Sequence, residues 1–414
     1  MKDEFYERNG LFALTKFLTN TNDSERREKC LKAFANISLY DEEEYKLKVS
    51  DEGMIDILLD FLQSESDNSL EIRELCFSIL SNLCKNCSKN KKIFRKKNGI
   101  ELIISALKDP NIGISPNYAL YTLAVLDCLW NAVLSNRKSE NVFLENEGFY
   151  ILMEFLEICG LLQRKMSLSC LSYLIENPKA INYFCDWNSS RTMINSTQLL
   201  IKLYELEDQR FNVKYRDGVL QDGDRPLNPK TRKNPMNARM PPSVGGSAQK
   251  LSPVPDGDEQ GDSDDPFIKK ARLSHMSAGD ALSKSKGFAK LKEALKAGES
   301  DTSVGAEAVL INKLQDRVED YDLRAIIFAI LYRTGFDRNE LLPNEVQRLE
   351  VIQVYPHFKI GEIWNDIKYE LDQENIKPTS DDYHWMITNI EEIQDIAVNS
   401  INTQQMVREP VFDE

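Results

Sequence analysis

The sequence lacks any run of about 18–20 uncharged apolar residues, which a helix needs to cross a bilayer. It also lacks an apolar signal core after its charged first residues, MKDE, so we expect no secretion. Basic residues are the minority, 52 against 66 acidic, and the net charge of −14 disfavours a duplex-wrapping nucleic-acid binder. Eight cysteines in 414 residues are then expected to be reduced thiols of an intracellular protein.

Residues that carry catalysis are also scarce. The only histidines are His275, His357 and His384, and none has a spaced Asp, Cys or His partner that would suggest a triad or a metal site. No glycine-rich phosphate loop follows a strand. Cys84 and Cys87 form a CxxC pair without a second pair, which favours a structural role. The sequence therefore predicts no enzyme and no catalytic, cofactor-binding or metal site.

What the sequence does contain is an internal repeat. Four glycines precede apolar runs at spacings of 43, 46 and 49 residues, and three asparagines each lie 17 residues before a glycine. These landmarks are Gly10, Gly53, Gly99 and Gly148, with Asn36, Asn82 and Asn131. Apolar residues at i, i+3, i+4 and i+7 predict helices, and a glycine before each can turn the chain with a positive φ. Units that cannot cover their own apolar faces predict an all-α fold of stacked repeats.

The period and the glycine and asparagine positions resemble the armadillo repeat. We therefore predict an armadillo-type α-solenoid of about four units over residues 1–207. The last unit, from Leu171, has no glycine at the expected place and is interpreted as a terminal cap. The upstream helices of the first unit would lie before Met1. Either a longer solenoid was cut there or another chain supplies the neighbour.

Composition changes after residue 207. Asp217-Gly218 between two extended runs predicts a short hairpin within 208–227. Eight of the 15 prolines fall between Pro226 and Pro266, so 228–300 is predicted to be a disordered linker. Five helical runs then predict a small acidic helical domain over 301–400, followed by a polar tail at 401–414.

The end of the predicted linker has a different character. Residues 287–297 predict a short basic amphipathic helix, which at this length would form only when docked. The apolar face of this candidate docking helix carries Phe288, Leu291 and Leu295.

Four separated strings carry a further resemblance. They are VFLENEGFYILMEFL from Val142, ENPKA from Glu176, RAIIFAIL from Arg324 and FKIGEIWNDI from Phe358. Their order, with the order of the parts, resembles the cilia- and flagella-associated protein 69 family over about residues 70–386, the interior at 231–300 being unmatched. Family members have further armadillo units before this start and a basic tail beyond the helical region. Whether the chain is a fragment, a short isoform or a shortened orthologue stays open.

This resemblance implies a structural scaffold of motile cilia and flagella. It places the protein in the cytoplasm and cytoskeleton, in the central apparatus of the axoneme, as a component of a central-pair projection (C1b) that supports ciliary assembly and motility. The implied partners are other projection proteins within a large multiprotein assembly, with tubulin of the central-pair microtubules as a candidate, and neither nucleic acid nor membrane. The alternative is a soluble armadillo adaptor in signalling or nuclear transport, although Trp130 and Asn131 are adjacent and do not have the Trp-x-x-x-Asn spacing of import armadillo proteins.

The string that most resembles the family signature runs through Phe358, Lys359, Ile360, Gly361, Glu362, Ile363, Trp364 and Asn365. Trp364 can be either a core anchor or an exposed interface residue. Ile360, Ile363, Trp364 and Ile367 share one helix face, and this spacing favours burial.

The net charge is unevenly distributed along the chain. It is −5 over 1–207 (25 basic, 30 acidic), +4 over 208–300 (17 and 13) and −13 over 301–414 (10 and 23). The solenoid nevertheless holds seven basic residues in 13 positions with no acid among them: Lys85, Lys89, Lys91, Lys92, Arg95, Lys96 and Lys97. This basic cluster is either a solvated face or a contact with an acidic partner, for which tubulin tails or an acidic neighbour in the projection are candidates.

Overall fold

A computed structural model describes residues 9–21, 23–39, 42–64, 69–216, 219–220, 227–228 and 321–406. The chain forms two compact units. Unit 1 comprises Met1–Glu207 and Ala289–Tyr355, and unit 2 comprises Asp208–Phe288 and Pro356–Glu414. Most of the predicted linker at 228–300, including the docking helix with Phe288, Leu291 and Leu295, lies outside the described residues, as do 301–320 and 407–414.

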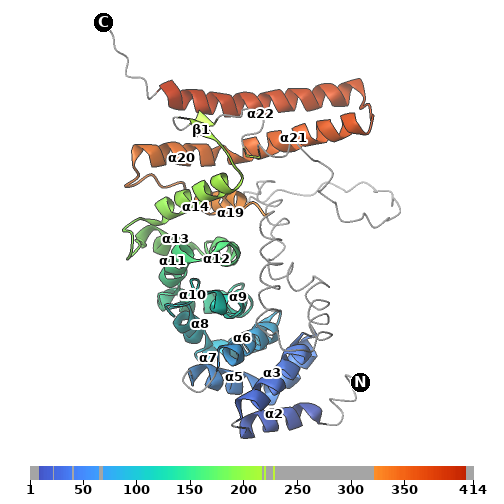
Figure 1. Ribbon diagram of the computed structural model, residues 1–414, viewed down its shortest axis with the longest axis vertical. Coiled ribbons are helices and arrows are strands. Elements are labelled where there is room, and N and C mark those ends of the chain that lie inside the picture. Colours follow the sequence, from blue (N-terminus) through green and yellow to red (C-terminus); the bar gives the residue numbers. More distant parts are fainter. Residues whose placement is uncertain are drawn as a thin grey trace, which may run out of the picture. The chain divides into compact units, whose positions relative to one another are not determined.

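Unit 1 is built from helices that recur in sets of three, a short first helix, a second helix after the landmark glycine and a third helix (Figure 1). The initial pair is α2 (Gly10–Asn20) and α3 (Ser24–Ser38). Three complete sets follow. They are α4 (Glu43–Asp51), α5 (Met54–Gln63) and α6 (Leu70–Cys84), then α7 (Ser88–Lys96), α8 (Gly99–Leu107) and α9 (Ala119–Cys128), then α10 (Arg137–Glu145), α11 (Gly148–Ile158) and α12 (Leu161–Leu174). In the second of these sets, the short η2 (Pro116–Tyr118) precedes α9 and the π-helical η3 (Leu129–Val133) continues it. The last set begins with α13 (Pro178–Asp186) and α14 (Ser196–Arg210). The predicted all-α armadillo-type solenoid is confirmed.

The third helices form one continuous row. Helix α3 packs on α6, α6 on α9 and α9 on α12, so each repeat covers the apolar face of the one before it (Figure 1). The next helix in this row is α19 (Arg324–Arg333), which packs on α12. Helix α19 therefore supplies the third helix of the last repeat, although residues 211–323 separate it from α14. The repeat that looks like a terminal cap in the sequence is a complete repeat with a long insertion.

Buried apolar residues, a hydrogen bond and an ion pair hold α19 in this position. Ile326, Ile327, Ile330 and Leu331 are all buried. At one end of α19 the Leu323 backbone N–H donates to a Glu207 carboxylate oxygen at 3.3 Å. At the other end Arg333 pairs with Glu176 at 3.0 Å. Covering the apolar side chains of α12 in this way is the same solution that every earlier repeat uses.

Helix α20 (Pro343–Gln353) follows α19 in unit 1 and packs on it. Arg348 of α20 pairs with Glu205 of α14 at 3.0 Å, and Gln198 of α14 donates to Glu345 at 2.9 Å. The sequence predicts one helical domain over 301–400, whereas the structure divides this range between the two units after Tyr355. The division follows from α19 and α20 burying their apolar side chains against the solenoid.

The landmark glycines have two different roles. The left-handed residue before each second helix is Asn9 (φ 56°), Asn98 (φ 60°) or Glu147 (φ 63°) in three cases, and Gly53 (φ 79°) in the fourth. Only Gly53 therefore has the positive φ that the sequence pattern suggests for all four. The other glycines are the first residues of their helices.

Close packing explains the glycine at that helical position. A Cβ on Gly99 would lie 2.5 Å from the ring of Phe94, and a Cβ on Gly148 would lie 2.5 Å from the ring of Phe143. Both rings are fully buried at the end of the preceding short helix. The glycine lets the backbone of the second helix rest directly on the phenylalanine of the first.

The recurring asparagines connect neighbouring repeats. Asn82 donates from Nδ2 to Ser38 Oγ of the preceding third helix at 3.0 Å, and Asn131 donates to Ser81 Oγ at 2.8 Å. Asn36, on the first third helix described, is exposed. These hydrogen bonds satisfy polar side chains in the row of third helices and help to fix its register.

The described residues of unit 2 form two short strands and two long helices. Strands β1 (Tyr215–Arg216) and β2 (Val219–Leu220) pair antiparallel, with Tyr215 opposite Leu220, on either side of Asp217-Gly218. Helices α21 (Tyr355–Gln373) and α22 (Ser380–Met406) follow. Across the described part of the chain, no helix is both long enough and apolar enough to cross a membrane.

The close contact at Gly148 generates a stability prediction. Gly148→Ser forces Cβ into the Phe143 ring, so we expect a loss of about 1–3 kcal/mol in the free energy of unfolding, measured by urea denaturation. Gly160→Ser is the matched control, because its Cβ would meet only the flexible Gln163 side chain, and its cost should stay within about 0.5 kcal/mol. Equal losses in the two variants would contradict the packing role of Gly148.

A truncation tests whether α19 completes the last repeat. A chain ending at Asn212 removes α19 and exposes the apolar face of α12, so we expect a lower thermal midpoint and faster amide exchange in α12 and α14. A chain ending at Tyr355 keeps both parts of unit 1 and should match the full chain in α12 exchange. If α12 exchanges equally slowly in both truncated chains, α19 is not a member of the repeat.

Candidate partner-binding surfaces

The described residues contain no group of three or more His, Cys, Asp or Glu side chains placed to hold a metal ion. His357 on α21 is half-buried, His384 on α22 is exposed, and His275 lies outside the described residues. Cys84 and Cys87 are both buried. Burial raises the pKa of the Cys84 thiol to about 12, so this group is protonated at neutral pH and is a poor nucleophile or metal ligand.

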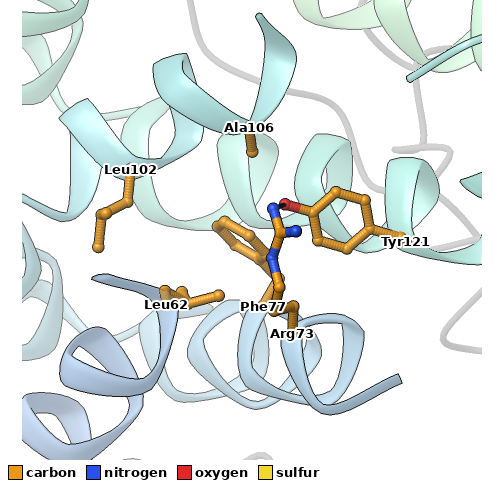
Figure 2. A pocket seen from close by; sticks show the side chains of 6 residues that line it. All are labelled: Leu62, Arg73, Phe77, Leu102, Ala106 and Tyr121. Carbon is orange, nitrogen blue, oxygen red and sulfur yellow. Dashed lines mark hydrogen bonds between the residues drawn. The ribbon is translucent and has the colours of Figure 1, made fainter. Parts of the chain in front are cut away.

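A shallow hollow at the seam between two repeats is part of the solenoid packing. Figure 2 shows the Arg73 guanidinium directed at the ring of Tyr121, and the two are also joined by a hydrogen bond from Nη2 to the hydroxyl at 2.7 Å. Phe77 packs edge-to-face on the same ring, with centroids 5.8 Å apart. Leu62, Leu102 and Ala106 complete the lining. This hollow joins consecutive repeats, and its one charged group already has a partner.

Trp130 has a similar packing role. It is half-buried, and its ring makes an edge-to-face contact with Tyr173 of the next third helix, with centroids 5.6 Å apart. Its neighbour Asn131 is engaged with Ser81. Both side chains therefore connect repeats.

The structure divides the basic cluster into two groups. The first group contacts neighbouring repeats. Lys91 donates to the Leu134 carbonyl at 3.2 Å, Arg95 donates to Asn136 Oδ1 at 3.2 Å, and Lys97 pairs with Asp56 at 3.2 Å. Burial lowers the pKa of the Lys91 ammonium, as expected for a cation enclosed between repeats. Lys85 is half-buried at the end of α6, and its carbonyl accepts a hydrogen bond from Lys46 at 2.7 Å.

The second group consists of exposed side chains. Lys89, Lys92 and Lys96 are exposed at positions i, i+3 and i+7 of α7, which places them along one face of the helix. We call these three residues the lysine stripe. The helix contains no acidic residue, so no carboxylate on α7 neutralises the stripe. The structure thus reduces a cluster of seven candidates to three.

The family-signature string lies on α21 in unit 2. Its buried members are Phe358, Gly361 and Glu362, while Lys359, Ile360, Trp364 and Asn365 are half-buried and Ile363 is exposed. A Cβ on Gly361 would lie 3.2 Å from Ile393 Cγ2, so this glycine permits close approach of α21 and α22.

Glu362 forms a polar clasp on residues 227–228. Its Oε1 accepts hydrogen bonds from the backbone N–H groups of Leu227 at 2.7 Å and Asn228 at 2.9 Å, and its Oε2 accepts one from Asn228 Nδ2 at 3.0 Å. Glu362 as a whole residue is 3% exposed, and each of its two carboxylate oxygens has a donor. No sequence pattern signals this contact, because its partners lie about 135 residues away.

The prediction that the apolar face of α21 with Ile363 and Ile367 is buried is wrong. Ile363 is 47% exposed and Ile367 is 37% exposed, although their spacing favours burial. The buried face is instead set by Gly361 against α22 and by Glu362 on residues 227–228. Trp364 lies beside this face and makes an edge-to-face contact with Trp385 of α22, with ring centroids 5.0 Å apart. Trp385 itself was given no role by the sequence.

Comparison with known proteins agrees with the repeat architecture. The family model described as cilia- and flagella-associated protein 69, ARM repeat, matches residues 5–249. Proteins named cilia- and flagella-associated protein 69 are similar in Mus musculus (25% identity over 327 residues, 77% of this chain) and Homo sapiens (26% over 322 residues, 76%). The chain spans about a quarter of the length of these curated relatives, 27% and 26%. One crystal structure of an engineered protein aligns with a TM-score of 0.40 at 18% identity, over 49% of this chain and 78% of its own. A second aligns with a TM-score of 0.41 at 14% identity, over 97% of this chain and 90% of its own.

The Glu362 clasp generates a prediction. Glu362→Ala leaves three donors without their acceptor, and each charge-assisted bond contributes about 1.5–3 kcal/mol. We expect the Leu227 and Asn228 amides to exchange at least tenfold faster by hydrogen–deuterium exchange. Glu370→Ala, an exposed carboxylate on the same helix, is the control and should leave both amides unchanged. Unchanged exchange in Glu362→Ala would show that residues 227–228 are held by other contacts.

Proposed function

The chain belongs to the cilia- and flagella-associated protein 69 family, and from this premise we propose that it is a non-enzymatic scaffold in a central-pair projection (C1b) of the axoneme. In this role it contributes contact surfaces for large neighbours in the cytoskeleton of motile cilia and flagella. Other projection proteins are the proposed partners, and the acidic tails of tubulin are a further candidate.

The observation that carries the proposal is the lysine stripe on a rigid solenoid. Three other members of the basic cluster fix α7 between its neighbouring repeats, through Lys91, Arg95 and Lys97. The stripe is therefore presented by a helix that does not have to be ordered on binding. Like charges on one exposed face raise the encounter rate with an acidic surface and select against a basic one.

The rest of the solenoid supports an architectural role. Several of its described polar side chains, among them Asn82, Asn131 and Arg73, join neighbouring repeats. A stack of repeats joined in this way gives a long surface on which several partners can be held at fixed spacing. In unit 2, residues 356–393 add nine acidic and three basic residues to the same chain.

Charge reversal of the stripe tests the proposal. In ciliated cells in which this chain replaces the endogenous protein, we expect Lys89→Glu, Lys92→Glu and Lys96→Glu together to reduce its amount in detergent-extracted axonemes at least fivefold. The cause would be repulsion between the reversed stripe and an acidic partner. The matched control reverses three exposed lysines elsewhere on the solenoid, Lys108→Glu, Lys138→Glu and Lys179→Glu, and should retain incorporation. Thermal unfolding of both variants checks that the fold is intact.

Two outcomes would count against the proposal. If the stripe variant is retained as well as the control variant, the stripe is a solvated face. If the unmodified chain is diffuse in the cytoplasm or nucleus and is washed out by detergent, the chain is a soluble armadillo adaptor and not an axonemal scaffold.

A further inference from the structure

Unit 2 exposes a compact aromatic and aliphatic surface where α21 meets α22. Trp385 is 57% exposed and contacts Trp364, while Ile363 and Ile367 lie one helical turn apart beside Trp364 on α21. We call these four residues the Trp364–Trp385 surface. Clustered large apolar side chains on a folded unit mark an interaction site more often than scattered ones do.

Carboxylates border this surface on both helices. Asp381 and Glu392 lie at i−4 and i+7 from Trp385 on α22, and Glu370 follows Ile367 by one turn on α21. All three side chains are exposed. Residues 356–393 carry nine acidic and three basic residues, so the wider surroundings have the same sign. A partner must therefore bring apolar side chains flanked by positive charge.

The negative charge around the Trp364–Trp385 surface argues against several classes of partner. Nucleic acid and anionic lipid surfaces would meet the carboxylates with charges of the same sign. A second copy placed symmetrically on the same surface would bring Glu370, Asp381 and Glu392 toward their own counterparts. A basic peptide has neither problem.

We propose that the Trp364–Trp385 surface is a docking site for a basic amphipathic helix of a partner protein. The apolar side chains of that helix would cover Ile363, Ile367 and the tryptophan edges. Its lysine or arginine side chains would lie over the exposed indole of Trp385 and against the adjacent carboxylates, which combines cation–π attraction with ion pairing. This inference does not depend on the axonemal placement proposed above.

A labelled peptide tests the surface in the full chain. The probe is KGFAKLKEALKAG, a basic sequence with apolar residues at helical spacing, copied from residues 286–298. We expect it to bind in the micromolar range by fluorescence anisotropy. Trp385→Ala, and separately Asp381→Lys with Glu392→Lys, should each weaken binding at least tenfold. The matched controls in unit 1 are Tyr332→Ala, an aromatic that is 50% exposed, and Glu71→Lys, an exposed acid, and neither should change affinity by more than twofold.

Each other outcome overturns the proposal. A scrambled peptide of equal composition that binds as well shows attraction by charge alone. Anionic vesicles that compete with the peptide show a membrane surface. Dimerisation that is lost in Trp385→Ala shows a second copy as the occupant. If the peptide binds only after Lys290→Glu, Lys292→Glu and Lys296→Glu in the chain itself, the occupant is this chain's own segment. No binding to a correctly folded chain shows that no basic helix docks there.

Discussion

The packing of α19 on α12 is the contact that completes the row of third helices in unit 1. Every repeat in the solenoid leaves the apolar face of its third helix for the next repeat to cover, so the row has to end on a helix that closes it. Here the closing helices come from beyond residue 320, and α20 then pairs with α14 through Arg348 and Glu205. The last repeat of the solenoid is therefore completed by residues that are far away in sequence.

The charged side chains are likewise divided between internal contacts and the exposed surface. Within one basic cluster, Lys91, Arg95 and Lys97 contact neighbouring repeats, whereas the lysine stripe is exposed along one face of α7. In unit 2 the Glu362 carboxylate is buried and hydrogen-bonded to residues 227–228, whereas Glu370 and Glu392 are exposed. Composition counts all of these charges alike. Local geometry decides which of them can meet a partner, as it does for the lysine stripe on α7 and for Glu370 and Glu392 in unit 2.

The sequence predicts the repeat well because its landmarks are local. Glycine and asparagine recur at short, regular spacings, and the helices follow from apolar periodicity. The sequence does not predict the packing role of Gly148, because this role depends on the Phe143 ring and not on a positive φ. Helix α19 could not be assigned to the last repeat, since no local pattern links it to α14. The prediction of the buried face of α21 is wrong for a related reason. The burial of Glu362 is stabilised by the N–H groups of Leu227 and Asn228, and the periodicity of apolar residues along a helix does not reveal such a contact.

Loop-closure entropy explains why a solenoid tolerates so long an insertion inside one repeat. The hydrogen bond between the Leu323 N–H and Glu207 closes a loop of 115 residues, numbers 208–322. The entropic cost of such a closure is about 4 kcal/mol, and doubling the loop adds only about 0.6 kcal/mol. Burying Ile326, Ile327, Ile330 and Leu331 contributes about 1.5–3 kcal/mol each, which exceeds that cost. The insertion can therefore change in length and composition with little effect on the solenoid, provided that α19 keeps the apolar face that fits α12.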